Sequence, residues 1–242
     1  MSLVVMRQVS RIYELGEVAI TALRDVNLDI QPEAFVSIVG PSGSGKTTLL
    51  NMIGCLDKPS SGEVSVNDTR VDGFAPKEAA QFRGQHLGFI FQGFNLLPVL
   101  TVFENVAYPL MMVQSVPEKL RRKKVLHYLE AVGMIDQKDK YPSQISGGQK
   151  QRAAVARALV TDPKLVLADE PTANLDHTSA FMVIGLMRKM QKDLKTTFIF
   201  STHDPKIMKE AEVLYTLEDG QITDHEIPEH GASQSSSEGE TI

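Results

Sequence analysis

An eight-residue segment, Gly40-Pro-Ser-Gly-Ser-Gly-Lys-Thr47, constrains the fold of this chain more than any other feature. It matches the pattern G-x-x-x-x-G-K-[ST], in which a glycine-rich loop turns around phosphates. The segment lies between an apolar run, residues 35–39, and a helical stretch, residues 48–56. Strand, loop and helix in this order are the context that the motif requires, so we expect an α/β fold that binds phosphate at a helix N-terminus.

The glycines and polar residues of this loop each have an expected part in holding a nucleotide. Gly40, Gly43 and Gly45 allow successive backbone N–H groups to point inward around a β-phosphate, and the following helix adds its N-terminal partial positive charge. Lys46 then supplies a charge to the β- and γ-phosphates, and Thr47 offers a hydroxyl to Mg²⁺. We therefore expect nucleotide contacts from the whole loop: Gly40, Pro41, Ser42, Gly43, Ser44, Gly45, Lys46, Thr47 and Thr48.

A second segment suited to anions, Ser146-Gly-Gly-Gln149, lies about 100 residues further along the chain. It opens a helical stretch that runs through Arg152 and Arg157, so it offers free N–H groups, a hydroxyl and a helix dipole. In isolation it would be an ordinary serine-capped helix start. One nucleotide does not need both segments from the same subunit. Together they predict half of a nucleotide sandwich, which a second copy of the chain would complete.

Two adjacent acids, Asp169 and Glu170, follow the apolar run of residues 165–168. At the carboxyl end of a buried strand their side chains leave in different directions, which lets them do separate jobs. We expect Asp169 to help hold Mg²⁺ through its water shell, and Glu170 to accept a proton from, or orient, the water that attacks a γ-phosphorus. An Asp-Glu pair alone is more often part of a turn, but beside a phosphate loop we favour the catalytic interpretation.

The composition is that of one α/β domain or of a core with an appended subdomain, since the chain has 242 residues, 42% of them hydrophobic. No apolar stretch approaches the roughly 18 residues of a membrane-spanning helix, and residues 1–9 do not resemble a signal peptide, so we expect a cytosolic protein. The single cysteine, Cys55, excludes an intramolecular disulfide and a cysteine metal cage; we interpret it as a packed thiol.

Charge argues against a general nucleic-acid surface, because the net charge is −5 and the pI is near 5.7. A basic run at residues 119–124 is either a contact patch or, as we favour, a solvated helix face. The Ser/Glu/Gly-rich residues 229–242 have too few apolar side chains to offset the entropy of ordering, and we expect a disordered tail there. The folded domain is predicted to span residues 1–228.

The pattern of apolar runs predicts two sheets and a helical region. Residues 3–9, 22–30 and 64–66 are typical of an antiparallel sheet near the N-terminus, and residues 213–217 and 221–223 of a closing hairpin around Asp219-Gly220. Short continuous apolar runs suit parallel strands that are buried on both faces, and four qualify: residues 35–39, 87–91, 165–168 and 197–201. Between residues 94 and 141 the strand signal vanishes and residues 118–132 show helical periodicity, so we expect a helical subdomain at about residues 94–160.

The order of the motifs resembles the ATPase subunit of ATP-binding cassette (ABC) transporters over roughly residues 3–222. The matching positions are Lys46, Gln92, Ser146-Gly-Gly-Gln149, Asp169-Glu170, Asn174-Leu-Asp176 and His203. The resemblance implies a P-loop NTPase cassette of α/β class, with a mostly parallel core sheet, an N-terminal antiparallel β subdomain and a helical subdomain. It also implies ATP and Mg²⁺ as cofactors and a homodimer with ATP sandwiched between the subunits.

The same resemblance implies roles for single residues. Gln92 is similar to the Q-loop glutamine at the metal, and His203 to the histidine that contacts the γ-phosphate. Tyr13 is similar to the aromatic residue that stacks on adenine, and Asp176 belongs to the D-loop. The catalytic set is then Glu170, His203, Gln92 and Lys46, and the metal set Thr47, Gln92 and Asp169; the signature residues Ser146, Gly147, Gly148 and Gln149 contact nucleotide, with Ile145 where leucine is usual.

Three stretches, residues 91–98, 104–106 and 167–172, resemble the ATPases of macrolide-exporter, lipoprotein-release and cell-division systems; Ala173 and the pair Glu33-Ala34 depart from that pattern. This implies a membrane permease as partner, peripheral location on the cytoplasmic face of the inner membrane through that permease alone, and no nucleic-acid partner. We expect the permease to dock near residues 92–100, whose apolar side chains either face it or pack inside the helical subdomain. The alternative is a non-transport ATPase of DNA repair or translation, but the short interval between Lys46 and Ser146 holds no heptad run or cysteine cluster.

Overall fold

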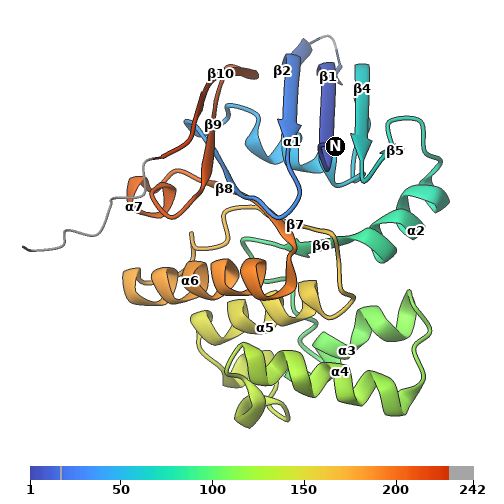
Figure 1. Ribbon diagram of the computed structural model, residues 1–242, viewed down its shortest axis with the longest axis vertical. Helices are drawn as coiled ribbons and strands as arrows, with labels where there is room; N and C mark the ends of the chain where they lie inside the picture. The colour runs from blue at the N-terminus through green and yellow to red at the C-terminus, as the bar shows by residue number, and fades with distance from the viewer. Residues whose placement is uncertain (17, 229–242) are drawn as a thin grey trace, which may run out of the picture.

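A computed structural model, which describes residues 1–16 and 18–228, places two sheets above a layer of helices (Figure 1). The larger sheet has the strand order β10-β9-β3-β8-β7-β6, and the smaller one the order β2-β1-β4-β5. The predicted tail, residues 229–242, lies outside the described residues. The predicted α/β class, with a parallel core and a separate N-terminal antiparallel sheet, is confirmed.

The core sheet is parallel from β9 to β6, because helical crossovers link its strands. The four predicted strands are present, and the hairpin strand β9 adds a fifth by pairing parallel with β3, while β10 pairs antiparallel with β9. Every residue of β3, β7 and β8 is buried, which explains their continuous apolar runs. The strands are β3 (Phe35–Val39), β6 (Leu87–Ile90), β7 (Leu165–Ala168), β8 (Thr197–Thr202), β9 (Val213–Glu218) and β10 (Gln221–Glu226).

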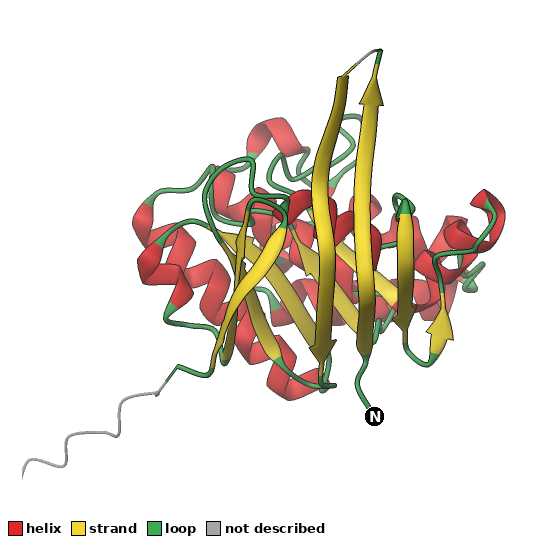
Figure 2. Ribbon diagram, turned by 90° about the horizontal axis from the view of Figure 1, so that it is seen from above, coloured by secondary structure: helices red, strands yellow, loops and turns green. Residues whose placement is uncertain are grey.

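The antiparallel sheet is longer than predicted. Its strands are β1 (Val4–Leu15), β2 (Val18–Ile30), β4 (Ser61–Val66) and β5 (Thr69–Arg70). The paired ends of β1 and β2 project beyond the rest of the sheet (Figure 2), and there Ile12, Val18 and Ile20 are exposed. Without a buried face, the alternation of apolar and polar residues that marks a strand is lost, so the sequence predicted only residues 3–9 and 22–30.

The helices lie mainly on the side of the core sheet opposite the antiparallel sheet (Figure 1). Between β6 and β7 there are only helices, as predicted, and α4 (Glu118–Ala131) matches the expected helix within one residue. The others in this stretch are α3 (Val102–Met112), the 3₁₀ turns η1 (Ile135–Gln137) and η2 (Pro142–Gln144), and α5 (Gly147–Leu159). Elsewhere are α1 (Lys46–Ile53), α2 (Pro76–His86), α6 (His177–Leu194) and α7 (Pro205–Met208). No helix in the described part of the chain is long and apolar enough to cross a membrane.

Two apolar cores, one on each face of the parallel sheet, hold these layers together. On one face Phe35 packs against Phe198 and Phe200, with ring centroids 5.9 and 5.0 Å apart, over helices α5 and α6. On the other face, side chains of α1 and of the antiparallel sheet cover residues such as Ile38. Cys55 is buried there as predicted, and burial raises the pKa of its thiol to about 11. The two cores fix the strand ends that carry the polar residues described next.

Candidate functional site

A cavity of about 690 Å³ lies where the phosphate loop meets the carboxyl ends of β6, β7 and β8. Polar and charged side chains from four separate parts of the chain converge on it, which is the usual place for a ligand in an open parallel sheet. Its lining consists of Ile20, Thr21, Ala22, Ser42, Gly43, Gly45, Lys46, Thr47, Thr48, Gln92, Asp169, Glu170 and His203. Most of the residues predicted from the sequence for phosphate and metal are therefore gathered at one site.

The phosphate loop is tightly built around Lys46. The ammonium group donates to the carbonyl oxygens of Gly40, at 2.9 Å, and Pro41, at 2.8 Å, and the side chain is only 8% exposed. Gly40 and Gly45 have φ of 145° and 105°, and a Cβ there would lie 2.0 Å and 2.4 Å from a backbone oxygen. Only glycine fits such a close approach, so these two positions allow the loop to lie against the neighbouring strands.

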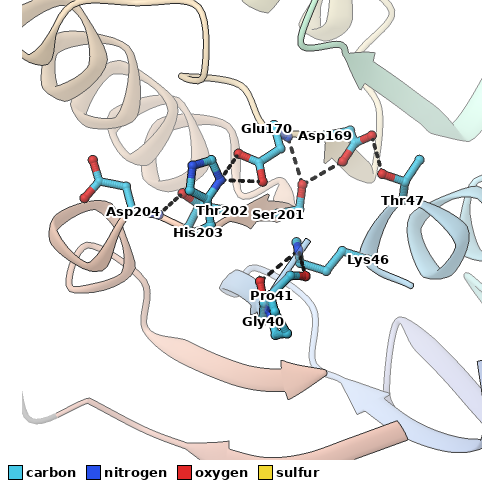
Figure 3. A network of polar contacts seen from close by, with 10 residues as sticks. All are labelled: Gly40, Pro41, Lys46, Thr47, Asp169, Glu170, Ser201, Thr202, His203 and Asp204. Atoms are coloured by element: carbon cyan, nitrogen blue, oxygen red, sulfur yellow. Dashed lines mark hydrogen bonds and ion pairs between the residues drawn. The ribbon is translucent and has the colours of Figure 1, made fainter. Parts of the chain in front are cut away.

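A chain of hydrogen bonds links the loop to the ends of β7 and β8 (Figure 3). The Thr47 hydroxyl donates to one oxygen of Asp169 at 2.8 Å, and the Ser201 hydroxyl donates to the other at 2.7 Å. The backbone N–H of Glu170 donates to the Ser201 oxygen at 2.8 Å. One serine on β8 thereby orients both acids at the end of β7.

Glu170 points away from Asp169 and toward His203. Its two carboxylate oxygens lie 2.9 and 3.0 Å from Nδ1 of His203 (Figure 3). The backbone of Glu170 is left-handed, with φ 46°, a conformation that is costly for a residue with a side chain and is common at functional sites. The expected divergence of the two acids is thus present, and the Glu170 carboxylate is paired with the His203 imidazole.

The oxygen atoms beside the loop suit a hard cation. Thr47 and Asp169 provide a hydroxyl and a carboxylate, the ligand types that Mg²⁺ prefers. Among the described residues no group of three or more His, Cys, Asp or Glu side chains could hold a metal alone. The donor set therefore fits Mg²⁺ that takes most of its remaining ligands from phosphate and water, as at other nucleotide sites.

Gln92 lines the same cavity and is held there by its backbone. The Asn174 amide donates to the Gln92 carbonyl oxygen at 2.9 Å. Just beyond, Phe94 and Asn95 have left-handed backbones, with φ of 62° and 48°, and their carbonyl oxygens accept hydrogen bonds from the half-buried Arg157 side chain. Burial lowers the pKa of Arg157 to about 10. The segment after Gln92 is thus anchored to helix α5.

The signature segment lies at a different place. Ser146 is the N-cap of α5: its hydroxyl accepts from the Gln149 N–H at 3.3 Å, and its own N–H donates to the Gln149 side chain at 2.9 Å. A recess of about 110 Å³ is formed by Ser146, Gly148, Gln149, Arg152, Ser179, Met182 and Val183, and none of these residues lines the larger cavity. Within one chain, the two segments predicted to bind phosphate therefore line separate cavities.

The recess at Ser146 lies next to the segment of residues 174–176. The Asp176 carboxylate caps α6 by accepting from the Ser179 N–H at 3.0 Å, and hydrogen bonds from Ser179 lower its pKa. A Cβ on Gly147 would touch Leu175 at 3.5 Å, so the segment lies directly against residues 174–176. The predicted D-loop and the signature segment are thus neighbours.

Tyr13 does not line the cavity. Its hydroxyl donates to Asp57 at 2.8 Å, and the Arg11 guanidinium carbon lies 4.4 Å from the centre of its ring. Its neighbour across β1 and β2 is Ile20, which does line the cavity. The structure thus places Tyr13 at the margin of the site.

Sequence reasoning missed some residues of the site. Ser201 was interpreted only as the end of a buried strand, although a polar side chain at a fully buried position requires a partner and was a usable signal. The cavity is also lined by three residues of β2. Ile20 and Thr21 precede the predicted strand, and Ala22 was predicted only as its first residue. Arg157 was noted only as part of a helix, since nothing in its neighbourhood marks a long-range contact.

Comparisons with known proteins agree with this geometry. The sequence profile of a family described as "ABC transporter" matches residues 23–173. A lipoprotein-releasing system ATP-binding protein, LolD, of Francisella tularensis is 43% identical over 216 residues, 89% of this chain and 94% of that protein. A macrolide export ATP-binding/permease protein, MacB, of Syntrophobacter fumaroxidans is 39% identical over 96% of this chain, which corresponds to 32% of the relative.

Solved structures give the same result. The ATP-binding cassette MJ0796 of Methanocaldococcus jannaschii, in a dimeric post-hydrolysis state bound to ADP and Pi, superposes with a TM-score of 0.86 at 40% identity. The match covers 93% of this chain and 98% of that one.

Proposed function

The chain belongs to the ABC transporter family of ATP-binding proteins, and on this premise we propose how its residues bind and hydrolyse ATP and with which partners it works. The observation that carries the proposal is the linked set of side chains at the cavity: Lys46 in the phosphate loop, Thr47 bonded to Asp169, and Glu170 bonded to His203. These side chains supply, from one subunit, a phosphate-binding cation, a metal ligand pair and a general base for phosphoryl transfer to water.

Each residue has a distinct part in this mechanism. The loop amides and Lys46 bind the β- and γ-phosphates, and Thr47, Asp169 and Gln92 would hold Mg²⁺, which neutralises charge on the phosphates when it is bound. Glu170 accepts a proton from the attacking water, and His203, at 2.9 Å from Glu170, orients that carboxylate and contacts the γ-phosphate. Tyr13 provides a face for the adenine ring.

A second copy of the chain completes each site. Because Ser146 and its neighbours lie outside the cavity, they serve the phosphates bound to a partner subunit, and two-fold symmetry builds two such sites at once. The dimeric form of MJ0796 with ADP and Pi supports this arrangement. Loss of the γ-phosphate then removes a contact that both subunits share, so hydrolysis loosens the dimer.

The test uses Glu170→Gln, which removes the proton acceptor and keeps the shape of the side chain. With ATP and Mg²⁺ this variant should elute as a dimer in size-exclusion chromatography, and the unmodified chain should return to a monomer as ATP is consumed. Lys77→Ala, on the exposed start of α2, is the matched control and should behave as the unmodified chain. A Glu170→Gln variant that stays monomeric at every concentration would contradict the proposal.

The permease is proposed to dock in a groove beside the segment after Gln92. The groove measures about 430 Å³, and its lining includes the apolar side chains of Leu56, Phe89, Phe91 and Val113. Arg157 also lines it and donates to the carbonyl oxygens of Phe94 and Asn95. An element of the permease seated there would therefore contact the segment that leads to Gln92, which gives it a route to the catalytic site.

The apolar residues that the sequence predicted for permease docking differ in how much of their surface is exposed. Leu97 is 40% and Val99 78% exposed, whereas Leu96 packs against the core and the Phe94 ring lies beside Gly147. We therefore propose Leu97 and Val99, with the groove, as the permease contact. Leu97→Asp and Val99→Asp should each reduce recovery of the permease with the tagged chain, and Val18→Asp, 61% exposed at the far tip of β2, should not. Full recovery with both variants would exclude this surface.

The relatives suggest the class of system. Their names describe lipoprotein release and macrolide export, and we propose that this chain powers a permease of that kind from the cytoplasmic face of the inner membrane. Membrane fractionation tests the location: the chain should sediment with membranes when the permease is present and stay in the supernatant when it is absent. A distribution that does not depend on the permease would contradict it.

A further inference from the structure

Arg11, Tyr13 and Asp57 form a closed cluster at the margin of the cavity. The Arg11 guanidinium pairs with one carboxylate oxygen of Asp57 at 2.9 Å, and the Tyr13 hydroxyl donates to the other at 2.8 Å. The same guanidinium lies over the Tyr13 ring, 4.4 Å from its centre, in a cation–π contact. Asp57 lies 44 residues beyond Tyr13 in the sequence, yet the three side chains fix one another, and the ring is held at both its face and its hydroxyl.

This cluster lies beside a part of the cavity that has no phosphate-binding residue. Tyr13 is the direct partner of Ile20 in the antiparallel pairing of β1 and β2, so the two side chains leave the same face of the sheet. Ile20 lines the cavity and is 47% exposed, although it is fully apolar. An aromatic ring and an exposed aliphatic side chain next to each other suit a flat, unsaturated ligand group such as a nucleobase.

Asp57 connects the cluster to the phosphate loop. Helix α1 begins at Lys46 and ends at Ile53, and the N–H of Asp57 donates to the carbonyl of Asn51 in that helix at 3.3 Å. The carboxylate thus lies just beyond the helix that begins at Lys46, and a backbone hydrogen bond ties its residue to that helix. Arg11 and Tyr13 belong to the other sheet, so the ion pair joins the element that faces the base to the element that faces the phosphates.

We propose that Arg11 and Asp57 are positioning residues that hold Tyr13 as the stacking surface for the base and keep it at a set distance from Lys46. The inference rests on the proposed function and deepens it. Since the guanidinium covers one face of the Tyr13 ring, only one face serves the base, and the ligand is oriented accordingly. A nucleotide that reaches both Tyr13 and Lys46 must then have a base and phosphates at the separation that the ion pair sets.

The cluster is suited to mutation because other contacts hold the backbone around it. Ser60, three residues after Asp57, binds Ser10 through its backbone N–H at 2.8 Å and Ile12 through its side chain at 3.0 Å. The Arg11 and Asp57 side chains are also partly exposed, at 23% and 27%, so solvent screens their charges. Removing either charge should leave the fold intact and act on the ligand.

The experiment compares ATP with inorganic tripolyphosphate, which has the phosphates without the base. Asp57→Ala and Arg11→Ala should each raise the KM for ATP roughly tenfold and leave kcat within about twofold, because ordering of the base and not the chemical step is lost. Tripolyphosphate, measured as a competitive inhibitor, should inhibit as it does the unmodified chain. Arg7→Ala, which removes another ion pair of β1 at 2.8 Å from Asp29, is the matched control and should change neither constant.

A double-mutant cycle shows whether the residues act through Tyr13. In a Tyr13→Ala background, Asp57→Ala should have no further effect on the KM for ATP. With Tyr13 intact, Arg11→Lys, which keeps the charge but not the planar fork, should lose less affinity for ATP than Arg11→Ala and more than the unmodified chain. Additive effects of Tyr13 and Asp57, an equal loss of tripolyphosphate binding, or a fall in kcat would each overturn the inference. ATP-dependent dimerisation of Glu170→Gln would still stand, so the two proposals fail separately.

Discussion

The phosphate-loop face and the signature face are built on opposite principles, although both use a helix N-terminus. The phosphate-loop face is a cavity of about 690 Å³, where side chains from β6, β7, β8 and the loop converge. The signature face is a recess of about 110 Å³ in which Ser146 and Asp176 already cap α5 and α6. The first can hold a nucleotide alone, and the second can only add contacts to one held elsewhere.

This difference supports the proposal that two copies of the chain form each site. On the signature face the side chains of Ser146 and Asp176 are already engaged in helix caps, and the recess has little depth to retain a ligand. Opposed to the phosphate-loop face of a partner, the N-terminal end of α5 and its helix dipole would add contacts to a γ-phosphate. Variants on the two faces should therefore fail in different ways.

The largest effect is expected for Lys46→Ala on the phosphate-loop face. The variant loses the charge that binds the phosphates, so ATP binding should weaken strongly and hydrolysis fall by ~10³. Titration with a fluorescent ATP analogue and a phosphate-release assay measure the two quantities. If this variant kept its ATP affinity, the phosphate-loop face would not be the one that holds the nucleotide.

Ser146→Trp should separate binding from assembly on the signature face. Ser146 is exposed, so the added bulk leaves the monomer folded but blocks a partner subunit. ATP affinity of the monomer should stay within about twofold, while dimerisation is lost and hydrolysis falls by ~10². Ser143→Trp, exposed three residues upstream, is the control and should dimerise with ATP. Normal dimerisation of Ser146→Trp would place the interface elsewhere.

Ser201→Ala tests how the phosphate-loop face aligns its acids. Its hydroxyl orients both Asp169 and Glu170, so its loss should lower kcat about tenfold with a smaller change in KM. Ser37→Ala on the neighbouring strand β3 is a matched control, because the Ser37 hydroxyl is buried without a hydrogen-bond partner in the described structure. Equal effects of the two variants would show that Ser201 contributes packing alone.

The smallest effect concerns the cap of α6. Hydrogen bonds from Ser179 lower the pKa of Asp176 in the folded chain, so its extra stabilisation is present above the ordinary carboxyl pKa and is lost as pH falls through the lowered value. Asp176→Asn keeps the cap without the charge. Its Tm should be lower by roughly 1 °C near neutral pH, and the difference should vanish in acid. A pH-independent difference would exclude the charge as its cause.

Local sequence patterns predicted the parts of the fold that are buried. The strands of the core and the loop at Lys46 were predicted with their bounds nearly correct, because burial on both faces leaves a continuous apolar run. The outer parts of β1 and β2 escaped prediction because Ile12 and Ile20 face solvent there.

In the site, motif order predicted which residues matter but not how they are held. Ser201 and Asp57 act through side-chain contacts with residues 32 and 44 positions away, and no local pattern encodes such distances. The same limit applies to Tyr13: the motif predicted a ring for the base, and its position depends on Arg11, which no motif marks.

The pairing of β7 with β8 has a consequence for how this protein can change over evolution. Ala168 of β7 is aligned with Phe200 of β8. The next residues in each strand direction, Asp169 and Ser201, are in contact because this register is kept without an inserted residue. A one-residue insertion or deletion inside β7 would turn the acids to the opposite side of the sheet, and one inside β8 would turn Ser201 away from them. Insertions and deletions should therefore accumulate in surface loops of this chain, while β7 and β8 keep their length.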